Sequence, residues 1–296
     1  MKGLPDYTIN IKGKLISLSE PHVMGILNIT PDSFYAGSRK QSEKEIAERA
    51  NSIIEEGGTM IDAGAFSTRP GAADVSKEEE MSRMRKGLTI IRKEQPEAIL
   101  SIDTYRPDVA RMAVEEFGAD IINDVSEGGI TGRANIPLNG SSAAHEDKYP
   151  EMFHMAANLK VPYILMSVRP TVENMLTAFS KEVLQLRELG AKDIIIDPGF
   201  GFGKDLRQNY ELLNNLEKLK ALGLPMLVGA SRKSMIFKLL GHTPDESLNG
   251  TSVINTISLM KGASILRVHD VREAAECAAI VRQTLGETDC SPYKLI

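Results

Sequence analysis

Most of the chain repeats one pattern, in which a short apolar run is followed by a polar cluster and then by a segment with helical periodicity. The runs recur every roughly 30–40 residues, which is the length that a strand and its crossover helix need. They are apolar along both faces, as expected of parallel strands that are covered by helices. The eight runs are Val23–Leu27, Thr59–Ala63, Ala98–Ile102, Asp120–Ile122, Pro162–Met166, Asp193–Ile196, Pro225–Val228 and Ala263–Val268.

The segments between the runs carry helix signals of their own. Ser42–Glu45 and Ser76–Glu79 have the spacing of a capping box, in which each side chain pairs with the backbone of the other residue. Pro107 and Pro150 suit the first position of a helix, where no backbone N–H is needed. Six glycines suit helix C-termini, namely Gly118, Gly190, Gly223, Gly241, Gly262 and Gly286.

Eight such units in about 270 residues predict an α/β fold, a closed (β/α)8 TIM barrel, in preference to an open doubly wound sheet. We expect residues 1–296 to form a single domain. Residues 1–20 alternate around Lys12 and Gly13, which predicts an N-terminal β-hairpin over one end of the fold. Residues 127–149 are polar and rich in Gly, Ser and Asn, which predicts a surface excursion after the fourth strand.

Composition narrows the class of protein. With 42% hydrophobic residues among 296, the chain can bury one large core, and with no Trp that core is aliphatic. The net charge of -5 argues against nucleic acid as a partner, because phosphate binding needs a basic face. No apolar run reaches the length of a membrane span, and two cysteines, Cys277 and Cys290, suit a reducing compartment. We therefore expect a cytoplasmic protein that contacts neither nucleic acid nor membrane.

Polar residues follow the apolar runs, at the ends of strands where barrel enzymes carry their chemistry. Asp103, Asn123, Asp197 and Lys233 follow four different runs and should converge in the barrel mouth. Carboxylates accept hydrogen bonds, lysine donates them and asparagine does both, a mixture that suits the edge of a flat, neutral heterocycle. Each buried partner left unpaired costs about 1–3 kcal/mol, so such a pocket rejects ligands that lack the matching groups.

A second set of residues suits an anion. Thr68 and Arg69 follow the second run, Arg267 and His269 lie at the end of the eighth, and all four could hold phosphate oxygens at the rim. Asn28, after the first run, offers an oxygen ligand for Mg²⁺. We therefore expect Mg²⁺ as a cofactor.

Simpler interpretations exist for single residues. Asp103 could serve only as a helix N-cap, and Lys233 could be a solvated residue at a helix start. We prefer a functional interpretation because four strands end in this way on the same face. The glycines of DPGFGFGK lack the spacing of a phosphate loop, and we expect this turn to present Phe202 as an apolar wall for an aromatic substrate. Residues 231–234 open the next helix, whose N-terminal amides could bind a carboxylate.

Seven blocks of sequence resemble the dihydropteroate synthase family. They are MGILNITPDSF, FSTRPGA, SIDTYRPDVA, INDVS, IIIDPGFGFGK, VGASRKSMI and RVHDV, in the order that the family has them, and they extend over nearly the whole chain. Two positions depart from the family's pattern. Phe66 stands where Glu is common, and Ser167-Val168-Arg169 stands where His-Met-Arg is common.

The resemblance implies condensation of 4-aminobenzoate with a dihydropterin that carries a hydroxymethyl diphosphate, with Mg²⁺ at Asn28. It also implies roles for the other strand-end residues. The pterin would be held by Asp103, Asn123, Asp197 and Lys233, of which Asp103, Asp197 and Lys233 would be catalytic. The diphosphate would contact Thr68, Arg267 and His269. The aminobenzoate would be bordered by Phe202, Lys233 and Ser234, with Arg69 closing over it.

Three other functions remain compatible with the residues. A pterin-binding methyltransferase would share the barrel and the Asp/Asn pocket but would need a corrinoid partner. An aldolase would use Lys233 to form a Schiff base, and a folate-like binding protein would bind pterin without releasing diphosphate. Segments Leu248–Met260 and Val271–Leu285 have apolar faces that predict a homodimer, although burial of these faces against the barrel explains them equally well.

Overall fold

Eight parallel strands form the centre of the computed structural model, which describes residues 6–29, 39–66, 75–128 and 149–286. The strand order is β8-β7-β6-β5-β4-β3-β10-β9, and a parallel bridge between Ile196 and Met226 links the two edges into a barrel. The predicted barrel is therefore confirmed. The strands are β3 (His22–Asn28), β4 (Met60–Gly64), β5 (Ile99–Asp103), β6 (Ile121–Asp124), β7 (Tyr163–Met166), β8 (Ile194–Asp197), β9 (Leu227–Val228) and β10 (Ile265–Val268).

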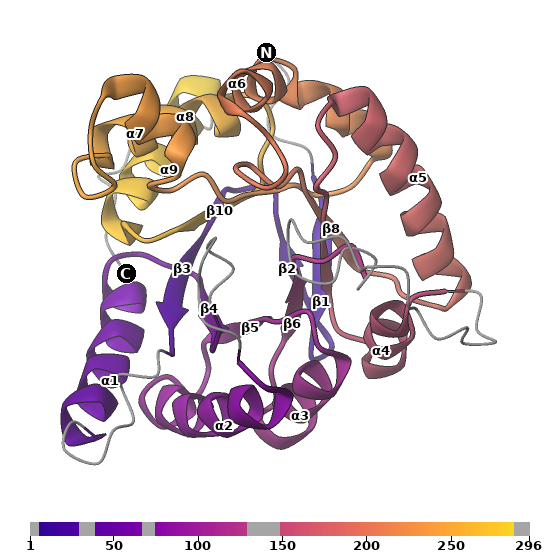
Figure 1. Ribbon diagram of the computed structural model, residues 1–296, viewed down its shortest axis with the longest axis vertical. Coiled ribbons are helices and arrows are strands. Elements are labelled where there is room, and N and C mark those ends of the chain that lie inside the picture. Colours follow the sequence, from indigo (N-terminus) through magenta and orange to yellow (C-terminus); the bar gives the residue numbers. More distant parts are fainter. Residues whose placement is uncertain (1–5, 30–38, 67–74, 129–148, 287–296) are drawn as a thin grey trace.

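Helices surround these strands, as Figure 1 shows in a view along the barrel. In the described part of the chain, each barrel strand leads to a helix, and β9 leads to two, α7 and α8. A 3₁₀ helix, Leu216–Leu222, follows α6. The α-helices are α1 (Arg39–Glu55), α2 (Lys77–Glu94), α3 (Pro107–Phe117), α4 (Glu151–Leu159), α5 (Val172–Glu188), α6 (Leu206–Asn214), α7 (Ser234–Leu240), α8 (Leu248–Met260) and α9 (Val271–Leu285).

The predicted N-terminal hairpin is confirmed and covers the end of the barrel at which the strands begin. Strands β1 (Thr8–Ile11) and β2 (Lys14–Ser17) pair antiparallel. Ile9 and Leu18 are buried in a cluster with inward-facing residues of seven barrel strands. Lys12 forms an ion pair with Asp120 at 2.7 Å, which ties the hairpin to the start of β6. The hairpin does not cover the opposite end, where the strands finish and where barrel enzymes carry their active sites.

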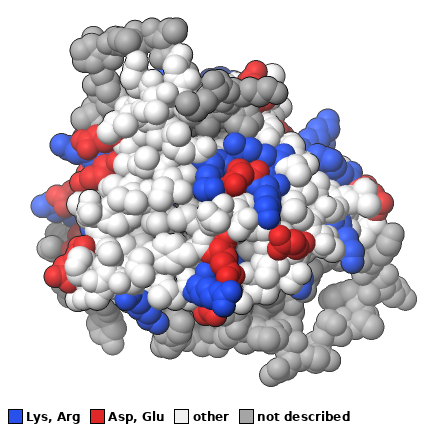
Figure 2. Space-filling view, turned by 90° about the horizontal axis from the view of Figure 1, so that it is seen from above, with Lys and Arg blue, Asp and Glu red and all other residues white. Residues whose placement is uncertain are grey.

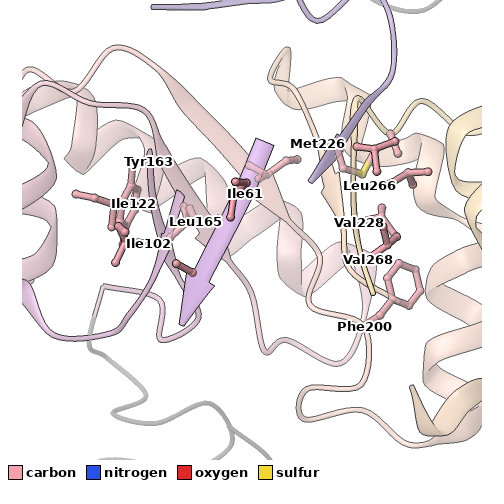
Figure 3. Packing of buried hydrophobic residues seen from close by; sticks show 14 of the residues in the cluster. Ile61, Ile102, Ile122, Tyr163, Leu165, Phe200, Met226, Val228, Leu266 and Val268 are labelled. Atoms are coloured by element: carbon pink, nitrogen blue, oxygen red, sulfur yellow. The ribbon is translucent and has the colours of Figure 1, made fainter. Parts of the chain in front are cut away.

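A larger cluster, mostly aliphatic, lies between the strands and the helices. Successive strand residues alternate between the two clusters, because neighbouring side chains in a strand point to opposite faces. Met60 faces the barrel interior, for example, while Ile61 belongs to the outer layer. Figure 3 shows part of that outer layer, with strand residues such as Ile122 and Leu266 and with Phe200 from the loop after β8.

The helix starts correct three details of the sequence analysis. Helix α1 begins at Arg39, so Ser42 lies inside the helix; Arg, Lys and Gln favour helix and extend it past the expected cap. Ser76 does cap α2 by accepting from the Glu79 backbone N–H, but the Glu79 carboxylate accepts from Arg83 and does not complete the predicted capping box. Pro107 is the first residue of α3, as predicted. Pro150 lies one residue earlier than expected, in the N-cap position of α4.

Most of the predicted surface excursion, residues 129–148, lies outside the described residues. Its first residue, Glu127, is not on the surface but fully buried. Its carboxylate accepts from the Ser167 hydroxyl and from the Val168 backbone N–H, at 2.9 and 3.0 Å. The segment therefore starts as a buried link between the ends of β6 and β7.

Candidate active site

The residues that the sequence analysis placed at the strand ends do occupy the same end of the barrel. Asp103 and Asp197 are the last residues of β5 and β8, and Asn123 precedes the last residue of β6. Lys233 follows β9 and lies directly before α7. Parallel strands finish at one face of a barrel, so the regular alternation of strand and helix places these four side chains around one mouth.

A buried carboxylate, Asp62 of β4, joins two of the pocket residues. Its Oδ2 accepts from Arg267 Nε at 2.6 Å and from Asn123 Nδ2 at 3.1 Å. Arg267 also donates from Nη2 to Asp103 Oδ2 at 2.6 Å. The predicted heterocycle pocket and the predicted anionic rim therefore share one hydrogen-bonded network. The carboxylates beside Arg267 raise its pKa against the effect of burial, so it stays charged.

Three acceptor atoms of this network lack partners. Asp62 Oδ1, Asp103 Oδ1 and Asn123 Oδ1 are buried and have no hydrogen-bond partner among the described residues. Buried polar atoms are normally paired, so three free acceptors at one mouth indicate a site for hydrogen-bond donors. Burial raises the pKa of Asp103 to about 7, with Arg267 opposing the shift and Asp62 adding to it.

The charges of Asp197 and Lys233 shift each other's pKa. Burial raises the pKa of Asp197 and the Lys233 ammonium opposes that shift; Asp197 Oδ1 also accepts from the Gly199 backbone N–H at 2.7 Å. Burial lowers the pKa of Lys233 to about 7, with Asp197 opposing. This buried lysine can donate a hydrogen bond in either protonation state, since a neutral amine keeps two N–H groups.

Phe202, which the sequence analysis predicts to be an apolar wall for the substrate, lies against Lys233. The ammonium nitrogen sits 4.2 Å from the centre of the Phe202 ring, within the range of a cation–π contact. Lys233 also donates to the carbonyl oxygen of Phe200 in the same loop. Phe202 packs near Met166 and Val125, so one apolar surface adjoins the polar pocket.

The remaining predicted residues lie around the same end. His269, after β10, pairs through Nδ1 with the Ser231 hydroxyl at 3.1 Å. Ser234 is the first residue of α7 and is partly exposed. Asn28 is the last residue of β3, and its side chain is exposed. Thr68 and Arg69 lie outside the described residues, so their predicted roles stay predictions.

The two departures from the family pattern have local partners. Phe66 packs edge-on against Tyr105, with the ring centres 5.1 Å apart, where a Glu side chain could not stack. Ser167 donates to the buried Glu127, and its backbone N–H bonds the Asp197 carbonyl at 2.8 Å.

Two residues near the site escaped the sequence analysis. Lys204 closes the DPGFGFGK motif, in which the sequence points to the glycines and to Phe202. Glu127 has polar neighbours, which predict a surface segment. A lysine that ends a glycine-rich turn is the signal that could have pointed to Lys204, because such a turn exposes carbonyl oxygens to it.

On the face shown in Figure 2, the Lys and Arg side chains form small groups beside Asp and Glu, and not a continuous basic surface. None of the helices in the described ranges combines the length and the apolar composition required to span a bilayer. Among the same residues, no cluster of three His, Cys, Asp or Glu side chains is arranged to hold a metal ion.

A barrel whose mouth carries these polar side chains is typical of enzymes that bind a small polar heterocycle. Residues 24–269 match the family described as pterin binding enzyme. Within this family of pterin-binding enzymes, the chain is similar to dihydropteroate synthases. The chain is 40% identical to dihydropteroate synthase of Escherichia coli K12, over 96% of this chain and 98% of that protein. It is 38% identical to the Bacillus subtilis protein of the same name, over 94% of both.

The fold agrees with these relatives. The structure of Xanthomonas albilineans dihydropteroate synthase with 4-aminobenzoic acid superposes with a TM-score of 0.81, at 31% identity, over 96% of this chain and all of that one. The Yersinia pestis enzyme in a sulfonamide complex gives a TM-score of 0.77 at 33% identity, over 94% of this chain and 99% of that one. The chain belongs to the dihydropteroate synthase family of pterin-binding enzymes.

Proposed function

We propose that this chain condenses 4-aminobenzoate with (7,8-dihydropterin-6-yl)methyl diphosphate to give 7,8-dihydropteroate and diphosphate. The observation that carries the proposal is the set of unpartnered buried acceptors, Asp62 Oδ1, Asp103 Oδ1 and Asn123 Oδ1, at a mouth that also holds Asp197 and Lys233. A pterin edge has amino and ring N–H donors for the carboxylates and a carbonyl acceptor for the lysine. Membership in the family supports the same substrate class.

The network around Asp62 suggests how the two halves of the first substrate are held together. Arg267 bonds Asp62 and Asp103 on the pterin side, and its guanidinium keeps further N–H groups for phosphate oxygens. His269 and, as expected from the sequence, Thr68 complete the diphosphate contacts. A cation that is already oriented by two carboxylates does not have to reorganise when charge develops on the departing diphosphate.

The donor set also fits Mg²⁺. This ion usually takes one or two protein oxygens and completes its shell with water and substrate phosphates. The exposed amide of Asn28 at the end of β3 suits this arrangement better than a cage of acidic residues, and the described residues contain no such cage. When bound, Mg²⁺ would neutralise charge on the diphosphate.

In the proposed reaction, the bond between the methylene carbon and the diphosphate oxygen breaks, and diphosphate leaves with the bonding electrons. The carboxylate of Asp197 stabilises the positive charge that the pterin methylene then carries. The amine nitrogen of 4-aminobenzoate, placed beside Phe202, Lys233 and Ser234, forms the new C–N bond and gives up one proton to the departing diphosphate. No protein nucleophile is needed for these steps.

Diphosphate release, measured with and without 4-aminobenzoate, tests the proposal. We expect release coupled to formation of dihydropteroate, and competition by a sulfonamide for the aminobenzoate site. Lys233→Ala and Asp197→Asn should lose activity and remain folded, because both residues lie at the open end of the barrel. Near-normal turnover in either variant would contradict the assignment of the pocket. Methyl transfer from methyltetrahydrofolate without any condensation would favour the methyltransferase alternative.

We also infer a homodimer that pairs through the last helices. Leu239 of α7, Val253 of α8 and Ile280 of α9 are about half exposed or more, at 55%, 49% and 64%. Apolar side chains this exposed are costly in water when they form one surface. Light scattering of the purified protein would test the inference, and a monomer at micromolar concentration would contradict it.

A further inference from the structure

Lys204 makes an unusual set of contacts behind the site. It ends the loop after β8, directly before Asp205, which caps α6. Its ammonium donates to three backbone carbonyls, those of Gly199 at 2.9 Å, Phe202 at 3.0 Å and Ser167 at 3.3 Å. A lysine ammonium has three N–H groups, so these bonds use its entire donor capacity. Two of the carbonyls belong to its own loop, and the third belongs to the residue after β7.

The loop that Lys204 holds is rich in glycine, and Lys204 acts there beside Asp197 and Asn209, which accept hydrogen bonds from the backbone N–H groups of Gly199 and Gly201. Gly199, Gly201 and Gly203 all adopt positive φ, at 66°, 78° and 61°, a region that side chains rarely enter. Backbone of this kind can adopt many conformations, so its native shape must be set by contacts with other groups. A Cβ atom at Gly199 would also collide with the Ser167 carbonyl oxygen, which shows how closely the loop lies against the end of β7.

The carbonyl at the end of β7 is itself held in place. Glu127 accepts from the Ser167 hydroxyl and from the Val168 N–H, and its carboxylate is fully buried. Lys204 therefore connects the loop after β8 to a segment whose position is already fixed by the buried carboxylate of Glu127.

The loop presents two groups to the catalytic lysine. The Phe200 carbonyl accepts from Lys233, and the Phe202 ring lies 4.2 Å from the Lys233 nitrogen. Lys204 binds the carbonyl of Phe202 directly. A shift of this loop would therefore move the wall of the aminobenzoate site and leave Asp103 and Asn123, on β5 and β6, in place.

We propose that Lys204 is a positioning residue for the second substrate: it ties the loop after β8 to the end of β7 and so places Phe202 beside Lys233. It acts through the loop and does not touch substrate. Burial disfavours a charged lysine here and lowers its pKa to about 8, with Asp197 and Glu127 opposing. Such a charge is tolerated inside a protein because all its donors are paired. The inference rests on the proposed function, since it assigns a role toward 4-aminobenzoate.

The test compares Lys204→Met with Lys181→Met in the full-length protein. Met keeps the length of the side chain and removes the donors, while Lys181 is an exposed lysine on α5 and serves as the matched control. We expect Lys204→Met to raise KM for 4-aminobenzoate by about tenfold, the effect of losing a few well-oriented bonds. KM for the dihydropterin diphosphate should change less than about twofold. Lys181→Met should change neither value.

Lys204→Arg keeps the charge and the N–H donors, and we expect it to recover part of the lost affinity for 4-aminobenzoate. Pterin binding by calorimetry shows whether each variant is folded. Unchanged KM for 4-aminobenzoate in Lys204→Met would overturn the proposal, and so would an equal rise in both KM values or no recovery in Lys204→Arg. If instead the unmodified protein releases no diphosphate from its substrates, the proposed function itself fails.

Discussion

Replacing Asp62 by Ala tests whether one buried carboxylate organises the site. Asp62 is fully buried and accepts hydrogen bonds from Arg267 and Asn123 through the same oxygen. Losing the charged bond to Arg267 should cost about 1.5–3 kcal/mol, and leaving the Asn123 amide without its acceptor about 1–3 kcal/mol. The sum is close to the loss of about 3–5 kcal/mol that follows when one partner of a buried ion pair is removed.

Asp103 should reduce this cost. It remains bonded to Arg267, and Asp62 is among the groups that raise its pKa. Without Asp62, the pKa of Asp103 should fall below about 7, so Asp103 ionises more readily and neutralises Arg267. We therefore expect the free energy of unfolding to decrease by about 3 kcal/mol, the lower end of the range.

Urea unfolding at pH 7.5 measures the loss, and diphosphate release measures its effect on the reaction. Asp62→Asn is the matched control, because it keeps an oxygen acceptor for Arg267 and removes the charge. It should lie between Asp62→Ala and the unmodified protein in both measurements. A loss of less than about 1 kcal/mol in Asp62→Ala would refute the reasoning, because it would show that Arg267 and Asn123 do not depend on Asp62.

Two further predictions concern stability. Burial raises the pKa of Glu182 from 4.5 to about 8, with Glu127 adding to the shift, so the native carboxyl stays protonated over a range in which the unfolded one ionises. The free energy of unfolding should therefore fall as pH rises from about 4.5 to 8. Glu182→Gln should remove that slope, and its free energy of unfolding should exceed that of the unmodified protein by about 2–4 kcal/mol at pH 8.5. Parallel curves of stability against pH for the two proteins would contradict this prediction. Leu18→Ala, at a fully buried position of the hairpin, should cost about 2–5 kcal/mol in urea unfolding and leave turnover unchanged, because the hairpin lies at the opposite end from the site. Leu15→Ala, at a position 72% exposed, is its control, and equal losses in the two variants would disprove the assigned packing.

The barrel could be predicted because its pattern is local. A strand such as Ile194–Asp197 is apolar until its last residue, and only an environment covered on both faces accepts such a run. Once the strands are parallel, their ends must meet at one face, so Asp103, Asn123 and Asp197 could be grouped without coordinates. The start of α1 could not be predicted from Ser42, because a cap signal does not exclude three good helix formers before it.

The connections within the site could not be predicted in the same way. That Asp62 bonds both Arg267 and Asn123 depends on strand register: Asp62 pairs with Ser101 on β5, and Arg267 pairs with Met24 on β3. A shift of one residue in either strand would turn a side chain to the other face. The sequence shows which residues reach the mouth, and register decides which of them touch.

Lys204 and Glu127 illustrate a further reason. Both act on backbone groups: one ammonium donates to three carbonyls, and one carboxylate accepts from a backbone N–H and a serine hydroxyl. Every residue has a backbone carbonyl, so the partners of Lys204 leave no pattern of residue types in the sequence. Residues that bind substrate are constrained by its chemistry and form recognisable motifs, whereas residues that position a loop are constrained by its path. The DPGFGFGK motif contains both kinds, and its glycines are what make a positioning lysine necessary.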